Sequence, residues 1–285
     1  MTTGSSYETY EKTHHNYDKT RAAVGSEQIV RRLNLQSGAK QLRILDAGCG
    51  TGVHLLALQQ AGFENLTGVD ASSTGLAVAG QKLGDAHKVN LVCSDIRSMP
   101  FAQATFDVIL LSFVLQHLPH KDEDELQEAT EKLFSHLTSL LSPGGQLIIV
   151  TCSKQQMSAD DGCMWYYKYF PQAAAKLAGR FLDIAVLKDL LGKSGMAPSA
   201  CLEEALEQTY FTDASLEATG PLDSTWRSGD SLFALCEKDA PLFEQNLAAL
   251  EADIKSGAVV NQIAAVKNRV AQIKQGVLLF AGKAA

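Results

Sequence analysis

The sequence predicts an α/β fold in which helices cover both faces of a largely parallel β-sheet. Strand and helix patterns alternate from residue 42 to residue 152 with short connections, which is typical of such sheets. The apolar residues of segment 106–112 follow one another without alternation, as expected for a strand covered on both faces. A glycine-rich stretch, 48–52, directly follows the first strand, where folds of this class bind their ligands.

Each element of this region is predicted from a local pattern. Short apolar runs indicate the strands, and apolar residues at helical spacing indicate the helices. The sequence SPGG, residues 142–145, is expected to separate the third helix from the fifth strand. The predicted strands are 42–46, 65–70, 88–95, 106–112 and 146–152, and the predicted helices are 53–62, 72–84 and 122–141.

The pattern changes after residue 152. An aromatic cluster, MWYYKYFP (164–171), precedes a predicted helix at 183–195 and a sixth strand at 197–206. Two amphipathic stripes follow, and they are expected to pack in the core. The first comprises Phe243, Leu247, Leu250 and Ile254; the second comprises Val259, Ile263, Val266, Val270 and Ile273.

The second stripe has the 4-3-4-3 spacing of a coiled coil, but it lasts barely two heptads. A helical insertion packed on the domain is therefore favoured. The last strand is predicted at 277–283, with 231–237 as the alternative. The later segment is preferred because it leaves the helices as an insertion between two paired strands.

Three parts of the chain are expected from this organisation. Residues 1–35 form an N-terminal helical lid, and residues 36–152 form the ligand-binding core. Residues 153–285 supply the remaining core strands, the C-terminal helices and a helical and aromatic lid insertion near 154–180.

Composition excludes several classes of protein. The formal net charge is −7, which disfavours binding to nucleic acid or to an anionic membrane. The polar N-terminus lacks the apolar core of a signal peptide, so a cytoplasmic protein is expected, as a monomer or a homodimer. The six cysteines include no C-x-x-C pair, which predicts free, mostly buried thiols and no metal site.

The glycine-rich stretch reads G-x-G-x-G, with Gly48, Gly50 and Gly52 following Asp46. Glycine adopts positive φ and lets a ligand approach the backbone without an intervening Cβ. A dinucleotide site has the spacing G-x-G-x-x-G and must accommodate a pyrophosphate. A carboxylate at Asp46 would repel that pyrophosphate, so a ligand carrying positive charge is favoured.

Two further carboxylates define the ligand. Asp70 ends the second strand and is placed to accept the two hydroxyls of a ribose. Asp95 ends the third strand and is placed to accept from an adenine amino group. An adenosine with a free ribose diol, no phosphate and a cationic amino-acid tail is S-adenosylmethionine (SAM).

With these residues identified, the chain resembles the class I SAM-dependent methyltransferases, in particular the small-molecule "methyltransferase type 11" group. The resemblance implies a Rossmann-like, mostly parallel seven-stranded sheet with an antiparallel last strand. It also implies SAM as methyl donor, S-adenosylhomocysteine as product and a small-molecule acceptor. The matching segments are ILDAGCGTG (44–52), GVD (68–70), CSDIRSMPF (93–101), FDVILLSFVLQHLP (106–119) and LSPGGQLIIV (141–150).

The resemblance also implies the residues of the site. In such enzymes an N-terminal helix with tyrosines often folds over the cofactor, and His117, just after the fourth strand, is expected to act as general base. The expected cofactor contacts are Asp46, Gly48, Cys49, Gly50, Gly52, Asp70, Ala71, Ser94, Asp95, Ile96, Ser112, Tyr17 and Arg21, and the expected acceptor contacts are Tyr10, His14, Trp165, Tyr166 and Tyr169.

Alternatives remain for these roles. His117 could instead be a helix-start histidine that only hydrogen-bonds to backbone, with His14 and His15 as rival bases. Aromatic faces suit cationic acceptors, but the aromatic cluster around Trp165 could equally pack an inserted lid. Trp226 is a weaker candidate for the same pocket.

Rival functions are distinguished by single features. Amino-methyltransferases of nucleic acids carry [N/D]-P-P-[Y/F] after the fourth strand, where this chain has SFVLQH. No cysteine directly follows the fourth strand, in the segment SFVLQH, which disfavours arsenite as the acceptor. The glycine spacing and Asp95 disfavour a nicotinamide-dependent oxidoreductase. A non-catalytic SAM-binding protein stays open, as does methyl transfer to a thiol, a metalloid or a macromolecule.

Overall fold

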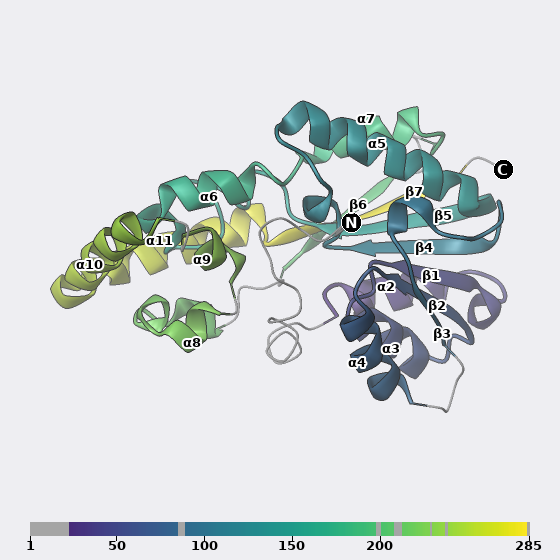
Figure 1. The fold of residues 1–285 in the computed structure, drawn as a ribbon, viewed down its shortest axis with the longest axis horizontal. Helices are drawn as coiled ribbons and strands as arrows, with labels where there is room; N and C mark the ends of the chain where they lie inside the picture. The colour runs from purple at the N-terminus through teal and green to yellow at the C-terminus, as the bar shows by residue number, and fades with distance from the viewer. Residues whose placement is uncertain are drawn as a thin grey trace.

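The computed structural model describes residues 23–84, 89–197, 201–207, 213–228, 230–236 and 239–283. Within these residues seven strands form one sheet in the order β3-β2-β1-β4-β5-β7-β6 (Figure 1). Strand β7 runs antiparallel to its neighbours β5 and β6, and the other pairs are parallel. The predicted mostly parallel sheet with an antiparallel last strand is confirmed. The strands are β1 (Arg43–Ala47), β2 (Asn65–Asp70), β3 (Asn90–Cys93), β4 (Phe106–Ser112), β5 (Leu141–Thr151), β6 (Leu202–Leu206) and β7 (Gly276–Gly282).

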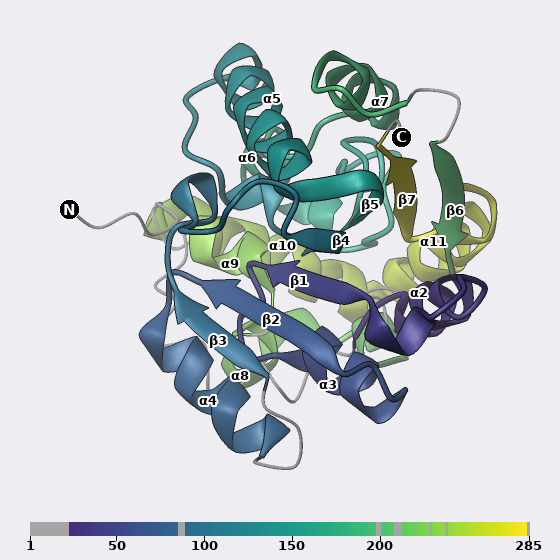
Figure 2. The ribbon, with the colours of Figure 1, turned by 90° about the vertical axis from the view of Figure 1, so that its right-hand side faces the viewer.

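Helices cover both faces of the sheet, as Figures 1 and 2 show. Helices α2 (Ser26–Leu33), α3 (Val53–Gln60) and α4 (Ser73–Leu83) cover one face, and α5 (Glu123–Leu140) and α7 (Ile184–Lys193) cover the other. Side chains of β4 alternate between the two cores: Val108 and Leu110 pack on the first face, and Ile109 and Leu111 on the second. Burial on both faces explains why this strand has no polar alternation.

The remaining helices form an extension beyond the end of β5, on the left of Figure 1. Helix α9 occupies the segment that was the alternative last strand, and the preferred strand is found as β7. The two amphipathic stripes lie on α10 and α11, where Leu250, Val259 and Val266 are buried and most of the other stripe residues are partly buried. The extension comprises α6 (Pro171–Ala178), α8 (Ser224–Arg227), α9 (Ser231–Cys236), α10 (Ala240–Ser256) and α11 (Ala258–Ile273).

The expected break between α5 and β5 is wrong. Strand β5 begins at Leu141, directly after the helix, and not at Gln146. Its pairing with β4 shifts from Phe106–Leu141 to Val108–Gln146, so the SPGG sequence forms a bulge within the strand. Gly144 has φ 72°, a conformation that glycine adopts readily and that the bulge accommodates.

All six cysteines are free thiols. Four of them, Cys49, Cys152, Cys163 and Cys236, are buried, whereas Cys93 is exposed. In the described part of the chain, no helix combines the length and the apolar character needed to cross a membrane.

Replacing Gly68, in the middle of β2, with alanine should destabilise the fold. An added Cβ would lie 2.6 Å from Leu55 Cδ1 and 2.9 Å from Cys49 Sγ. Overpacking of this kind typically costs about 1–3 kcal/mol. Urea denaturation should therefore show a lower free energy of unfolding for Gly68→Ala.

Gly80→Ala is the matched control. Gly80 lies on the exposed side of α4, and its nearest neighbour would be 3.7 Å from the added Cβ. Its free energy of unfolding should rise by about 0.5–1 kcal/mol, because alanine favours helix over glycine. Equal stability of Gly68→Ala and the wild type would contradict the packing around β2.

Candidate functional site

The candidate site lies at the carboxyl edge of the sheet, between β1 and β4. Strands β2 and β3 lie on one side of β1, and β4 and β5 lie on its other side, so the strand order reverses between β1 and β4. Ligands bind in the crevice that such a switch of strand order leaves open. Asp46, Asp70 and Ser112 lie at or near the carboxyl ends of β1, β2 and β4, and Asp95 follows β3.

The three glycines after β1 all have positive φ: 84° for Gly48, 51° for Gly50 and 76° for Gly52. The loop is held because the N–H groups of Gly48 and Cys49 donate to Val69 O at 2.7 and 3.0 Å. A Cβ on Gly48 would lie 2.6 Å from Val114 Cγ2, whereas a Cβ on Gly50 would meet nothing within 4 Å. Gly50 therefore faces open space that a ligand can occupy, while Gly48 is required by packing.

Asp46 carries a buried carboxyl oxygen that no hydrogen bond in the described part of the chain satisfies. Its side chain is 1% exposed, and its Oδ1 has no hydrogen-bond partner among the described residues. Burial, followed by the negative charge of Asp70, raises the pKa of Asp46 to about 8. A buried acceptor of this kind is costly unless a ligand supplies a donor or a positive charge.

Asp70 shapes the loop from the neighbouring strand. Its Oδ2 accepts from the Gly50 N–H and its Oδ1 from the Ser72 N–H, both at 2.8 Å. These two bonds fix the carboxylate at the end of β2, next to the open face of Gly50. Because each carboxylate oxygen has further acceptor capacity, Asp70 can still accept from ribose hydroxyls.

Asp95 is already paired in the protein. The guanidinium of Arg97 donates to both oxygens, from Nε at 2.9 and 3.0 Å and from a terminal nitrogen at 2.5 Å. The hydrogen bond from Arg97 lowers the pKa of Asp95, so this carboxylate is charged at neutral pH. An adenine amino group would share Asp95 with Arg97, a partner that was not predicted.

Helix α3 begins directly after the loop, and no side chain caps its N-terminus at Gly52. Its second residue, His54, was missed by the sequence reasoning. His54 is buried, and its Nε2 lies 2.9 Å from Ser112 Oγ. Burial lowers the pKa of His54 to about 4, so a neutral imidazole joins the glycine loop to the end of β4.

Phe113, directly after β4, has φ 50°, an unusual conformation for a bulky residue. Its N–H donates to Val150 O at 2.9 Å, and its carbonyl accepts from Gln116 Nε2 at 2.7 Å. The short helix η3 (Leu115–His117) follows, so the strained residue turns the chain toward His117. His117 is half-buried, with Nε2 at 3.4 Å from Gln116 Nε2.

The other predicted cofactor residues lie at the same edge or outside the described chain. Ala71 follows β2, and Ser94 and Ile96 follow β3; the Ser94 N–H donates to Asp70 O at 3.1 Å. Cys49 is buried, which raises the pKa of its thiol. The residues outside the described part of the chain are Tyr10, His14, His15, Tyr17 and Arg21.

The aromatic candidates pack within the extension. Trp165 and Tyr166 are buried with ring centroids 5.5 Å apart, and Trp165 Nε1 donates to Ser215 O at 2.7 Å. The Tyr169 hydroxyl lies 2.7 Å from oxygens of Asp253 and Gln262. Contact of these three aromatic residues with the acceptor stays a prediction.

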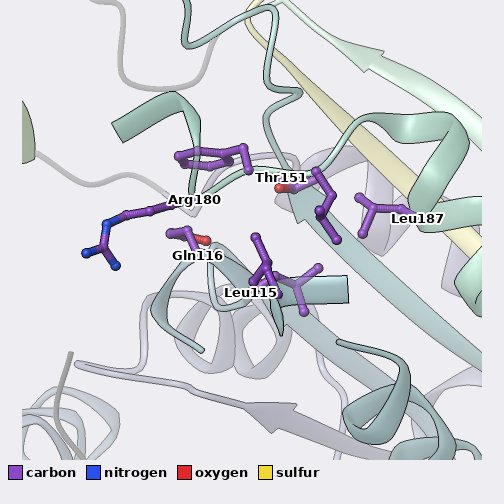
Figure 3. Close-up of a pocket in the computed structure, with 8 residues that line it drawn as sticks. Leu115, Gln116, Thr151, Arg180 and Leu187 are labelled. Atoms are coloured by element: carbon purple, nitrogen blue, oxygen red, sulfur yellow. The ribbon is translucent and has the colours of Figure 1, made fainter. Parts of the chain in front are cut away.

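A small cavity adjoins η3 on the side of α5 and α7 (Figure 3). Its lining comes from segments far apart in the sequence, which is why a pass along the chain did not find it. The lining residues are Leu115, Gln116, Leu126, Thr151, Arg180, Phe181, Leu182 and Leu187.

Comparison with known proteins agrees with this geometry. Residues 45–149 match the family model described as a methyltransferase domain. The demethylmenaquinone methyltransferase of Bacillus subtilis is 28% identical over 180 residues, which cover 59% of this chain and 72% of that enzyme. The demethylmenaquinone methyltransferase of Bacillus licheniformis is 28% identical over 154 residues, and the match spans only 62% of its length.

Solved structures share the fold. A putative methyltransferase from an antibiotic biosynthesis pathway of Anabaena variabilis has a TM-score of 0.68 at 20% identity, covering 93% of this chain and 99% of that one. Phosphoethanolamine N-methyltransferase 2 of Haemonchus contortus, solved with SAM, has a TM-score of 0.53 at 20% identity, covering 91% of this chain and 52% of that one. Residues 45–149 thus match a methyltransferase domain and the chain shares the fold of these solved methyltransferases, in agreement with the resemblance to the class I SAM-dependent methyltransferases.

Proposed function

We propose that this protein transfers a methyl group from SAM to a small-molecule acceptor. The observation that carries the proposal is the buried carboxyl group of Asp46, whose Oδ1 has no partner among the described residues, near the open face of Gly50. SAM brings an ammonium group to such a carboxylate and no phosphate that it would repel. The matched relatives are named for demethylmenaquinone, a small molecule, which supports an acceptor of that size.

In the proposed binding mode, each carboxylate at or near the end of a strand contacts one part of SAM. Asp46 holds the ammonium, Asp70 accepts from the ribose hydroxyls, and Asp95 accepts from the adenine amino group. The Asp70 carboxylate is positioned by the Gly50 and Ser72 N–H groups, so little side-chain freedom is lost on binding.

Bound SAM supplies a sulfonium methyl group that an acceptor attacks in line, with loss of positive charge. The protein's part is to position both partners and to exclude water, more than to supply strong acid or base. A base is needed only where the acceptor carries a proton at neutral pH. His117, just after Ser112 at the end of β4, is proposed to remove that proton.

The insertion near 154–180 and the residues before α2 are proposed to form a lid. The position of the extension beyond the end of β5 supports this role (Figure 1). Helix α2, inside the predicted segment 1–35, instead packs on one face of the sheet through Ile29 and Leu33. A cytoplasmic location, a monomeric or homodimeric state and the lack of a nucleic-acid partner belong to the same proposal.

Incubation with radiolabelled SAM and fractionated cell metabolites tests the activity. Label should enter a small molecule, and that molecule then serves as acceptor for the measurements below. Saturable binding of SAM without any labelled product would favour the non-catalytic alternative.

Asp46 should give the fold a distinctive pH dependence. Its pKa is raised to about 8 in the folded protein, above the value of about 3.9 in an unfolded chain. The folded state therefore holds an extra proton between these values, so its free energy of unfolding falls as pH rises from about 4 to about 8. Asp46→Asn lacks this titration. Relative to the wild type, its free energy of unfolding should therefore rise by about 2–4 kcal/mol between about pH 5 and pH 8.

Urea denaturation across this pH range measures the difference, with Asp107→Asn as control. The hydrogen bond from Arg43 lowers the pKa of Asp107 to about 2. Its effect on stability is therefore constant over the same range. Parallel pH profiles for Asp46→Asn and the wild type would show that Asp46 is already charged in the unliganded fold.

Asp70→Ala should weaken SAM binding by about 1.5–3 kcal/mol, because a charged acceptor is lost from the ribose hydroxyls and from the loop. Calorimetry with SAM, S-adenosylhomocysteine and NAD measures this. Asp239→Ala is the control, since Asp239 also accepts a backbone N–H but caps α10 in the extension. Tight binding of NAD without binding of SAM would overturn the proposed cofactor.

His117→Ala should lower turnover by roughly 10²-fold or more while SAM affinity stays nearly unchanged. The wild-type rate should rise with pH through one ionisation that the variant lacks. His120→Ala is the control, because His120 Nδ1 is engaged by Leu118 O at 2.7 Å. Normal turnover of His117→Ala would show that His117 has only a structural role. A fall in both turnover and SAM affinity would show that His117 supports the cofactor loop.

A further inference from the structure

A histidine–serine pair joins the helix after the glycine loop to the end of β4. His54, the second residue of α3, is 5% exposed, and its Nε2 lies 2.9 Å from Ser112 Oγ. Ser112 is the last residue of β4 and is only half-buried. The proposed binding mode gives neither side chain a role, although the pair lies at the candidate site.

Ser112 and Asp46 lie on the same face of the sheet. In β4, Val108 and Leu110 belong to the core that α3 covers, and Ser112 continues their alternation. In β1, Asp46 follows Ile44 of the same core by two residues. Asp46 pairs with Leu110. Ser112 is therefore the diagonal neighbour of Asp46, one step nearer the open edge.

The imidazole of His54 is neutral, because burial lowers its pKa to about 4. A neutral imidazole donates through one nitrogen and accepts through the other. When Nε2 carries the hydrogen, it donates to Ser112 Oγ, and the hydrogen of the serine hydroxyl must then point away from the ring. In this tautomer the half-buried hydroxyl presents a donor to a ligand.

The amino-acid tail of SAM carries an ammonium group and a carboxylate on the same carbon atom. The carboxyl group of Asp46 suits the ammonium and would repel the carboxylate. The carboxylate therefore needs a donor next to Asp46, where Ser112 lies. The amino-terminal end of α3, which no side chain caps at Gly52, carries partial positive charge that favours the same group.

From this arrangement we infer that His54 is a positioning residue, which donates from Nε2 to Ser112 Oγ and thereby directs the serine hydroxyl to the carboxylate of bound SAM. The inference rests on the proposed function and adds how the site recognises the amino-acid tail. His54 contacts no part of the ligand itself. It holds the hydroxyl in the binding orientation before the ligand arrives, so less freedom is lost on binding.

The test compares S-adenosylhomocysteine with its decarboxylated counterpart, which keeps the ammonium, the ribose and the adenine. Calorimetry on the full chain measures both. Ser112→Ala should lower the affinity for S-adenosylhomocysteine about tenfold or more, because a hydrogen bond to a charged group is lost. Its affinity for the decarboxylated ligand should change by less than about twofold, because that ligand has no carboxylate to lose.

Ser142→Ala is the matched control. Its hydroxyl also has a partner, Asp107 Oδ1 at 2.9 Å, but it lies near the amino end of β5, away from the candidate site. Ser142→Ala should bind both ligands as the wild type does.

Two substitutions of His54 separate positioning from packing. The amide nitrogen of glutamine reaches about as far as imidazole Nε2, whereas that of asparagine is too short to reach Ser112. His54→Asn should lower the affinity for S-adenosylhomocysteine about fivefold, and His54→Gln should stay within about twofold of the wild type. Because His54 acts only through Ser112, adding His54→Asn to Ser112→Ala should weaken binding no further. Urea denaturation establishes that each variant is folded.

Three results would overturn the inference: equal losses for the two ligands in Ser112→Ala, equal losses in His54→Gln and His54→Asn, or additive losses in the double variant. The first needs no change at His54, so it decides the matter even if the His54 variants do not fold. A wild-type protein that binds neither ligand would instead reject the proposed function. The two failures are therefore distinguishable.

Discussion

The buried carboxylate of Asp46 imposes the electrostatic constraint to which the rest of the site is adapted. It lies on β1, opposite Leu110 of β4, so the central pair of parallel strands carries an acidic group into the interior. Solvent cannot compensate the charge there, and a second carboxylate, Asp70, raises the pKa further. The positive φ values of the following glycines keep the adjacent backbone open at Gly50, so a cationic ligand can reach the charge.

The end of β4 connects the glycine loop to η3 and to the small cavity beside it. His54 reaches Ser112 from the glycine-loop helix, and the next residue, Phe113, is held in a left-handed conformation. The Phe113 carbonyl then accepts from Gln116, which contacts His117 and lines the cavity. A neutral His54 suits this arrangement because burial disfavours its charged form.

Topology explains where the extension lies. Strand β6 runs parallel to the first five strands and ends at the carboxyl edge, whereas the antiparallel β7 starts at that edge. Everything inserted between Leu206 and Gly276 must therefore leave and re-enter the sheet beside the site. The antiparallel last strand thus places α8, α9, α10 and α11 at the same edge of the sheet as the candidate site.

The sequence by itself determined the strand–helix alternation, the bounds of β2 and β4 and the carboxylates at the strand ends, because these depend on local apolar patterns and on chain order. Tertiary structure decided the rest: the bulge in β5, the Arg97 partner of Asp95, the contact between His54 and Ser112, and the cavity at Gln116. Each of these features depends on contacts or on a strand register that packing sets. Hydropathy along a chain reports whether a residue is buried, but which groups meet inside depends on how the layers pack on one another.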